Sequence, residues 1–509
     1  MAATRPAPAP VPCIRLTTET LQVAAAGGRW DEIVAPVVCL AFDYGPRPAG
    51  VAAVRDRRAE AEAQGALERH GALELDGLED CAAAPGSRAD YVIRLDGDVD
   101  AICAFSSQAL PALRAAGFRV EIDPAYPWQV ATAGAEWYAA LAPAGDAPDW
   151  FGLELGVEVD GERVNLLPAL LELVEQAVSL DALARGVRRC VALPIGERRY
   201  LTVPPERLRL LLAVLVELYQ GPGAGRDRVV FPAVRAAALA RLGVAFHDGG
   251  APLRWEGATQ VRDLGYQLAM GPRLAPAPVC GLQAVLRPYQ QAGVEWLQHL
   301  RALDAGGVLA DDMGLGKTLQ TIAHLLAERA SGRADRPSLV VVPTSLLGNW
   351  CRELARFAPE LVVVTLHGAA RRARHRELAR TGADVVLTTY PLLVRDRELL
   401  VMQRWHLLVL DEAHTIKNAD SQAHDAARAL TARHRLCLTG TPIENRLSDL
   451  WSIFDFVNPG LLGSAKQFTA FAKRLAARPH NPYEPLRELV RPYILRRLKT
   501  DKSVIDDLP

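Results

Sequence analysis

The stretch GGVLADDMGLGKTLQTIAHLL, residues 306–326, decides the fold of the second half of the chain. A short apolar run is followed by a glycine-containing loop and then by apolar residues at helical spacing. Gly314 and Gly316 would let backbone N–H groups curl around phosphate oxygens, at the positive N-terminus of the helix that follows. The Lys317 ammonium would then reach the β and γ phosphates, and the Thr318 hydroxyl would bind Mg²⁺.

The loop departs from the strict GxxxxGK[ST] pattern at one position, where Asp311 stands in place of glycine. The alternative to a phosphate site is therefore a glycine-rich helix N-terminus that holds no ligand. Lysine usage favours the site, because the chain has 52 Arg but only six Lys, and Lys317 is the first Lys. A compact ammonium fits between phosphates where a planar guanidinium would not. Genomic base composition still explains the scarcity of lysine itself.

Short apolar runs alternate with helical stretches from residue 281 onward. The runs are GGVLA, SLVVVP, LVVVTLH, ADVVLTTY, WHLLVLDE and HRLCLTG. This alternation predicts an α/β fold with a parallel sheet that is covered by helices on both faces. Ligands of such sheets bind beyond the carboxyl ends of the strands, so the polar residues that end these runs are the candidates for chemistry.

One of these runs, WHLLVLDEAHTIKN (405–418), delivers two carboxylates to the end of a strand. Asp411 suits a contact with Mg²⁺, either direct or through water. Glu412 suits the polarisation of an attacking water molecule. A strand that ends in a solvated acidic turn is the alternative, but the phosphate loop 94 positions earlier in the same predicted sheet favours a shared site.

These motifs together resemble a known family. LADDMGLGKT, DEAH and LTGTP (438–442) are similar to motifs I, II and III of superfamily-2 helicases. They are closer still to the Swi/Snf family of ATP-dependent DNA translocases. LRPYQQAGVEWL (286–297), VVPTSLLGNW (341–350) and LTTYPLL (387–393) resemble further motifs of that family. The resemblance covers about 280–509, and the family tolerates a residue other than glycine at the position of Asp311.

The resemblance implies an ATP-binding first motor lobe that couples ATP hydrolysis to movement on double-stranded DNA. It implies a RecA-like P-loop lobe over 281–509, with a helical protrusion at about 456–495. The implied ATP-binding residues are Gln290, Gly314, Leu315, Gly316, Lys317 and Thr318, and the implied Mg²⁺ ligands are Thr318 and Asp411. Glu412, Lys317 and Asp411 would be catalytic, and Gln290 would read the adenine edge, since amides suit paired hydrogen bonds. A helix-surface role for Gln290 is the alternative.

Other residues would connect the nucleotide to DNA if the resemblance holds. His414, Thr439 and Thr441 would couple the site to the partner lobe and the DNA face. Helix capping by His414 and strand-end capping by the two threonines are the alternatives. Pro343, Thr344, Thr388 and Thr389 would meet DNA phosphates through hydroxyl and backbone N–H groups. Arg496, Arg497 and Lys499 could also face DNA.

The first half of the chain has a different character. Its Pro-Ala start predicts a disordered tail over 1–13, and 14–275 is predicted to form an α+β accessory region of one or two subdomains. LELGVEVDGERVNLL is predicted to be a hairpin that turns at Asp160-Gly161. The Pro-rich stretch 271–281 predicts the boundary. The net charge is -8 over 1–280 and +7 over 281–509, within a total of -1 for 509 residues.

Cysteine and hydropathy patterns point to the cytoplasm, with association to the nucleoid through DNA. The eight Cys are scattered singly without CxxC spacing, which disfavours a zinc site and fits reduced thiols. No stretch approaches the ~20 consecutive apolar residues that a membrane span needs, so no membrane contact is expected.

Motors of this family have two RecA-like lobes, and the second supplies the arginine fingers. Nothing after LTGTP resembles the second-lobe motifs, so we expect a truncated chain that binds ATP·Mg weakly and barely hydrolyses it. The alternative is a non-catalytic module in which residues 14–275 bind a protein partner and the lobe is vestigial. The intact Lys317, Asp411 and Glu412 favour the motor.

Overall fold

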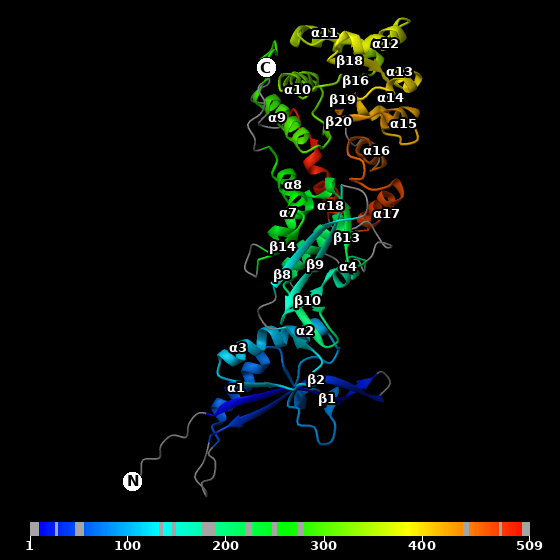
Figure 1. Ribbon diagram of the computed structural model, residues 1–509. Coiled ribbons are helices and arrows are strands. Elements are labelled where there is room, and N and C mark those ends of the chain that lie inside the picture. The colour runs from blue at the N-terminus through cyan, green and yellow to red at the C-terminus, as the bar shows by residue number, and fades with distance from the viewer. Residues whose placement is uncertain are drawn as a thin grey trace, which may run out of the picture. The chain divides into compact units, whose positions relative to one another are not determined.

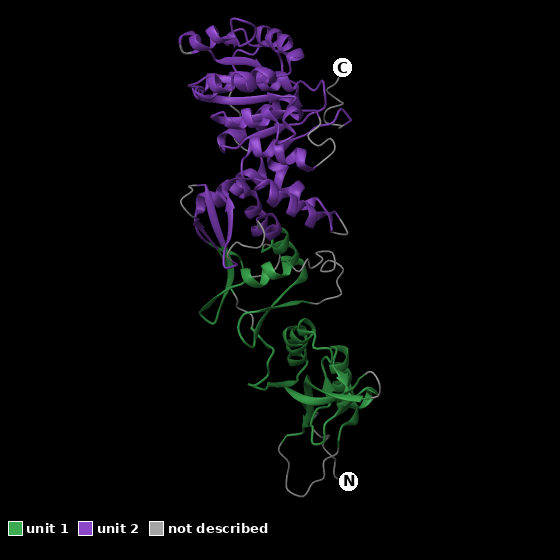
Figure 2. Ribbon diagram, turned by 90° about the vertical axis from the view of Figure 1, so that its right-hand side faces the viewer, with its two compact units in different colours: residues 1–139, 154–213, 245–255 green, residues 140–153, 214–244, 256–509 purple. Residues whose placement is uncertain are grey.

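The computed structural model divides into two compact units. It describes residues 10–25, 29–45, 55–131, 136–144, 149–175, 190–218, 226–246, 252–272, 279–440, 447–477 and 481–500. Unit 1 comprises residues 1–139, 154–213 and 245–255, and unit 2 comprises 140–153, 214–244 and 256–509 (Figure 2). Strands β8 (Glu136–Pro143) and β9 (Trp150–Val159) each run from one unit into the other.

Unit 1 begins with a long antiparallel hairpin of β1 (Val11–Ala25) and β2 (Arg29–Asp43). The sheet has the order β3-β5-β2-β1-β4, with β6 paired to β1. The predicted tail over 1–13 is wrong at its end, because residues 11–13 form part of β1 and Cys13 pairs with Ala41. A local Pro-Ala pattern could not reveal a partner strand about thirty residues away. Residues 1–9 lie outside the described residues.

Helices cover this sheet and build a core on it. Ile14, Leu16 and Val38 pack with Leu67 and Leu113, all at most 2% exposed. The remaining elements of this part are α1 (Arg57–Arg69), β3 (Leu73–Glu74), η1 (Leu75–Gly77), β4 (Cys81–Ala83), β5 (Tyr91–Val92), α2 (Val99–Ala104), η2 (Phe105–Ala109), α3 (Leu110–Ala115) and β6 (Arg119–Ile122).

The predicted hairpin around Asp160-Gly161 is confirmed. Strand β9 pairs with β10 (Glu162–Asn165), and Val159 lies opposite Glu162. Asp160 has φ 54° and Gly161 has φ 78°, a left-handed pair that Asp-Gly accepts readily. The elements that follow are α4 (Leu167–Glu175), β11 (Val191–Pro194), β12 (Arg199–Val203) and α6 (Pro205–Leu218), and β12 also pairs with β7 (Gln129–Val130).

Unit 2 is built on a seven-stranded sheet of order β17-β18-β16-β19-β20-β15-β21. Its strands are β15 (Gly307–Leu309), β16 (Ser338–Val342), β17 (Val363–Thr365), β18 (Val385–Thr389), β19 (Trp405–Asp411), β20 (Ala432–Leu438) and β21 (Ile494–Leu495). Every pairing is parallel, which confirms the predicted α/β fold. Strand β19 is buried along its whole length, because both faces are covered.

Helices flank this parallel sheet on two sides (Figure 1). On one side lie α9 and α10, and on the other lie α13, α14 and α15. The helix bounds are α9 (Pro288–Ala302), α10 (Lys317–Ala330), η4 (Thr344–Leu346), α11 (Leu347–Phe357), α12 (Arg371–Thr381), α13 (Tyr390–Arg395), α14 (Arg397–Val401), η5 (Ala413–Ile416), α15 (Gln422–Ala429) and α16 (Leu447–Val457).

The region of the predicted protrusion, about 456–495, is mostly helical. It holds α17 (Ala465–Ala476), α18 (Glu484–Val490) and the short turn η6 (Arg491–Tyr493). Its last two residues differ from the prediction, because Ile494 and Leu495 pair with Val308 and Leu309 as a strand of the main sheet. Two residues are too few to show a strand pattern in the sequence.

The two units do not divide at the predicted boundary near residue 280. Unit 2 also contains β13 (Val229–Pro232), η3 (Ala233–Arg235), α7 (Ala237–Val244) and α8 (Thr259–Met270), and β14 (Arg254–Gly257) crosses its edge. Ala237 and Leu268 belong to the same apolar core as Trp296 and Leu300. An amphipathic pattern marks a helix face that must be covered, but it does not show which surface covers it. In the described residues, no helix is long and apolar enough to cross a membrane.

Candidate nucleotide site

The sheet order brings the two predicted halves of the site together. Strand β20 lies between β15 and β19, with Leu438 paired to Leu309 on one side and to Asp411 on the other. The loop after β15 and the carboxylates after β19 therefore meet at the carboxyl edge of one parallel sheet. This is the edge at which α/β sheets bind their ligands.

The loop between β15 and α10 requires its two glycines. Gly314 has φ 87° and Gly316 has φ 79°, a backbone region that residues with a Cβ rarely adopt. A Cβ on Gly316 would also lie 2.5 Å from the side-chain Nε2 of Gln290. Gly316 is the N-cap of α10, so the helix begins directly beneath the loop. This arrangement suits an anion, as predicted for phosphates.

Lys317 lies inside this loop. Its Nζ donates to the carbonyl oxygens of Asp311 at 2.6 Å and Asp312 at 3.4 Å. Burial lowers the pKa of Lys317, while the negative charges of Glu412, Asp311 and Asp411 oppose the shift. The ammonium of Lys317 therefore lies within the loop. Phosphate oxygens bound there would replace the two carbonyl oxygens as its hydrogen-bond acceptors.

Asp411 is anchored by an aromatic side chain that sequence reasoning missed. The indole Nε1 of Trp350 donates to Asp411 Oδ2 at 2.7 Å, and the backbone N–H of Glu412 donates to Oδ1 at 2.9 Å. Burial raises the pKa of Asp411, and the Trp350 bond opposes this. The Tyr390 hydroxyl donates to the carbonyl of Asp411 at 2.8 Å. A buried indole N–H needs a hydrogen-bond acceptor, so a buried tryptophan is expected to bind a polar group. The sequence does not show that this group is Asp411.

Glu412 has a strained backbone at the carboxyl edge of the sheet. Its φ is 49°, which is unusual for a residue with a Cβ and is found most often where function requires it. Its side chain is 23% exposed, and His414 Nδ1 lies 3.3 Å from its Oε2. The contact brings together two residues that were predicted to act together, and the coupling role itself stays a prediction.

The oxygen donors of the site fit Mg²⁺, which prefers carboxylate, hydroxyl and phosphate oxygens. Asp411 lies at the end of β19, and Thr318 is half-buried in the first turn of α10. In the described parts of the chain, no group of three or more His, Cys, Asp and Glu side chains could hold a metal alone. An ion at this edge would therefore take other ligands from phosphate groups and water.

Gln290 is buried and uses its amide within the protein. Its Oε1 accepts from the backbone N–H of Arg287 at 3.0 Å, so it caps α9. Its Nε2 donates to the carbonyl of Leu315 at 3.3 Å, within the phosphate loop. Tyr289 and Leu315 pack on each other beside it. Gln290 therefore contacts the loop, and its predicted recognition of adenine stays a prediction.

The predicted coupling and DNA-binding residues have different environments. Thr439 is fully buried, and its backbone N–H donates to Leu309 O at 3.1 Å. Thr388 and Thr389 are 2% and 1% exposed, so their side chains are covered in this unit. Thr344 is exposed and Pro343 is half-buried, at the turn that begins η4. Thr441 lies outside the described residues. The Pro343-Thr344 turn is thus the more accessible of the two pairs.

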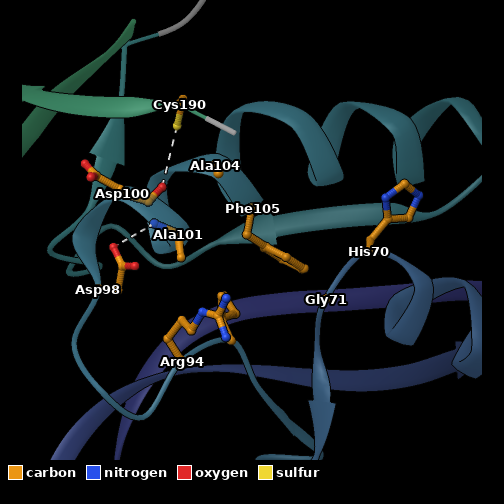
Figure 3. A pocket seen from close by; sticks show the side chains of 10 residues that line it. His70, Gly71, Arg94, Asp98, Asp100, Ala101, Ala104, Phe105 and Cys190 are labelled. Carbon is orange, nitrogen blue, oxygen red and sulfur yellow. Dashed lines mark hydrogen bonds between the residues drawn. The ribbon is translucent and has the colours of Figure 1, made fainter. Parts of the chain in front are cut away.

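Unit 1 contains a separate cavity of about 210 Å³ (Figure 3). His70, Arg94, Asp98, Asp100 and Cys190 contribute to its wall. Three of its polar contacts serve the fold: Asp98 accepts from Ala101 N at 3.2 Å, Asp100 accepts from Ala192 N at 2.8 Å, and Cys190 Sγ donates to Asp100 O at 3.5 Å. These acidic side chains are thus already used in capping and strand contacts.

Comparison with known proteins agrees with the geometry. Residues 289–509 match the family model of the SNF2-related domain. The putative ATP-dependent helicase/translocase YwqA of Bacillus subtilis is 44% identical over 267 residues, which cover 51% of this chain and 28% of that protein. The TATA-binding protein-associated factor mot1 of Aspergillus fumigatus is 42% identical over 253 residues, 45% of this chain and 13% of its own.

The comparison with solved structures includes the Sulfolobus solfataricus SWI2/SNF2 ATPase core in complex with dsDNA, at 42% identity and a TM-score of 0.43. The match covers 46% of this chain and 49% of that one. This chain spans less than a third of the length of the two curated relatives. Residues 289–509 are thus similar to the SNF2-related domain.

Proposed function

We propose that residues 289–509 are the ATP-binding motor lobe of a DNA-dependent ATPase that couples hydrolysis to movement along duplex DNA. One observation carries the proposal. The Lys317 ammonium, in a glycine loop at a helix N-terminus, lies at the same carboxyl edge of one parallel sheet as Asp411 and Glu412. A phosphate-binding cation, a metal-binding carboxylate and a second carboxylate together match the needs of phosphoryl transfer to water.

Each side chain would have a distinct task. Lys317 would neutralise charge on the β and γ phosphates, and Asp411 with Thr318 would orient Mg²⁺. Glu412, held by its strained backbone and partly exposed, would accept the proton of the attacking water. Duplex DNA would meet the Pro343-Thr344 turn, where hydroxyl and N–H groups can contact phosphates without reading sequence.

We also propose that turnover stays low unless a second RecA-like lobe closes over the nucleotide. Charge on the transferring phosphoryl group is usually stabilised by arginine from a partner element. The edge described above contributes a lysine and carboxylates. A DNA-stimulated rate near that of two-lobed motors, measured on this chain alone, would contradict this part of the proposal.

The main test is nucleotide binding by Lys317→Ala against a matched lysine. Lys466 on α17 is exposed, so Lys466→Ala controls for the loss of one ammonium. We expect Lys317→Ala to weaken the affinity for fluorescent ADP by about tenfold or more, since a hydrogen bond to a charged group is lost. We expect Lys466→Ala to bind like the unmodified chain. Equal affinities of the two variants would mean that the loop is not the nucleotide site.

A further inference from the structure

The residues that follow the helical protrusion run alongside the phosphate loop. We call residues 494–499 the strap. Leu495 O accepts from Ala310 N at 2.7 Å, and Arg497 O accepts from Asp312 N at 3.1 Å. The backbone N–H of Lys499 then donates to the Asp312 carboxylate at 3.0 Å. The strap therefore follows the loop from the end of β15 onward, and its backbone is bonded to the loop at successive positions.

Arg497 points into the protein from this strap, toward the residue at which the loop departs from the strict phosphate-loop pattern. Asp311 is completely buried, and the side chain of Arg497 is 12% exposed. The Arg497 Nε donates to Asp311 Oδ1 at 3.0 Å, and its Nη2 donates to Oδ2. The backbone N–H of Arg497 also reaches Oδ1, at 3.1 Å. The prediction that Arg497 could face DNA is wrong, because its guanidinium instead neutralises a buried carboxylate in a two-pronged contact.

The same guanidinium reaches two further elements of the nucleotide site. Its Nη1 donates to the carbonyl of Tyr289, next to Gln290 on α9. Its Nη2 donates to Gln320 Oε1 on α10 at 2.7 Å. Arg497 is thus bonded at once to the phosphate loop, to the helix beneath the loop and to the helix that carries the predicted adenine-binding residue.

Gln320 connects the Arg497 guanidinium to the phosphate loop through hydrogen bonds. It is completely buried, and its Nε2 donates to Asp311 Oδ2 at 3.2 Å and to Leu315 O at 3.3 Å. Leu315 O is also the acceptor of the Gln290 amide. The carbonyl between the two loop glycines is therefore held by two side-chain amides, one of which is positioned by Arg497.

A glycine in α9 makes room for this network. A Cβ on Gly293 would lie 1.9 Å from Gln320 Oε1 and 2.9 Å from Arg497 Nη2. Contacts below 3.0 Å would force both groups to move. The helix thus has no side chain at the one place where the Arg497–Gln320 bond crosses it, which indicates a close fit between α9, α10 and the strap.

We propose that Arg497 is a positioning residue for the nucleotide, and that docking of the strap on Asp311 holds the phosphate loop in its binding conformation. This inference rests on the proposed nucleotide site. Because coupling between two events is reciprocal, a nucleotide in the loop must in turn stabilise the docked strap. Asp311, in place of the usual glycine, is then the residue through which the loop binds the strap.

The test compares two neighbouring arginines in the full chain. Arg497→Ala removes the buried guanidinium, and Arg496→Ala removes an exposed one from the adjacent residue. We expect Arg497→Ala to weaken the affinity for fluorescent ADP by about tenfold, within the usual range of coupling between sites. We expect Arg496→Ala to leave the affinity unchanged. Circular dichroism would establish that both variants are equally folded, and Arg497→Lys replaces Arg497→Ala if the latter does not fold.

Hydrogen exchange gives a readout that a merely structural role would not change. In the unmodified chain and in Arg496→Ala, ADP is expected to slow amide exchange over residues 494–499. In Arg497→Ala or Arg497→Lys, that ADP-dependent protection is expected to be lost. Unchanged affinity and unchanged protection in folded Arg497 variants would overturn the inference.

The Lys317→Ala variant separates this inference from the proposed function. If ADP binding does not depend on Lys317, the nucleotide site itself is wrong. If binding depends on Lys317 but not on Arg497, only the positioning role fails.

Discussion

Two groups of charged residues in unit 2, each partly buried, differ in what surrounds them. One is the nucleotide edge, with Lys317, Asp411 and Glu412. The other, which we call the buttress, consists of Glu217, Arg235, Arg241 and Glu488, between the segment 214–244 and the region of the protrusion. Arg235 donates to Leu461 O at 2.8 Å and to Glu217 O at 3.2 Å, and Arg241 donates to Glu488 Oε2 at 3.0 Å and to Glu217.

The two groups differ in what their charges face. In the buttress, each side chain is bonded to another part of the fold, and burial raises the pKa of Glu217 to about 8 and lowers that of Arg235 to about 10. At the nucleotide edge, the charges gather at the carboxyl ends of parallel strands, beside two glycines in left-handed conformations. Buried charge and a shifted pKa are therefore not enough to identify a functional site. The position at the carboxyl edge of the sheet, beside the glycine loop, distinguishes the two.

The largest effect is expected for Glu412→Gln at the nucleotide edge. Loss of a general base should reduce ATP turnover by about a thousandfold. The amide keeps the shape of the side chain, so the affinity for ADP and the free energy of unfolding should stay close to those of the unmodified chain. Steady-state hydrolysis in the presence of duplex DNA and a second lobe would measure the rate. Turnover that persists in Glu412→Gln would assign the base to another residue.

The opposite outcome is expected for Arg235→Ala in the buttress. Removal of the guanidinium leaves the buried carbonyl oxygens of Leu461 and Glu217 without their donor, and each unsatisfied group typically costs about 1–3 kcal/mol of stability. Urea unfolding should show this loss, whereas ADP affinity measured on the folded protein should not change. Arg404→Ala, at an exposed position, is the matched control. A Arg235→Ala variant with normal stability would show that the buttress does not hold the segment 214–244 in place.

The smallest effect is a pH dependence of stability that depends on Glu217. Its folded pKa of about 8 lies above its ordinary value of 4.5, so the folded state binds more protons between these values. Its contribution to stability is present at low pH and is lost as the pH rises toward 8. His324 and His434, whose pKa values burial lowers from 6.5 to about 4, act in the opposite sense between pH 4 and 6.5.

The window between pH 6.5 and 8 therefore isolates Glu217 from these two histidines. Unfolding free energies should fall across this window in the unmodified chain and should be flatter in Glu217→Gln. Parallel pH profiles for the two proteins would indicate that Arg241 keeps Glu217 ionised throughout, despite its burial.

Much of the main sheet of unit 2 was predictable, because its signals are local. All six apolar runs from GGVLA to HRLCLTG contain strands, since continuous β-branched and leucine-rich segments between helical stretches are typical of buried parallel sheets. The turn at Gly314 and Gly316 and the hairpin at Asp160-Gly161 could be predicted from the sequence, because few residue types adopt a positive φ. The roles proposed for Lys317, Asp411 and Glu412 came from spacing and chemistry, and they remain to be tested.

What could not be predicted depends on contacts between distant residues. Strand β21 has only two residues, and it is defined by its partner β15 rather than by its own pattern. Trp350 and Asp411 are 61 positions apart, and Arg497 and Asp311 are 186 apart. The sequence shows an aspartate at position 311, where glycine is usual. It does not show which basic side chain neutralises the Asp311 carboxylate.

The amino-acid sequence alone predicted the parallel sheet, the glycine loop before a helix and the family resemblance, because these features depend on residue type and short spacing. The fold alone decided that Arg497 turns inward to Asp311, that Thr388 and Thr389 are covered, and that residues 214–244 belong to unit 2. The reason is physical: a buried charge or an apolar helix face must be satisfied by some partner, but local sequence does not specify which distant group supplies it.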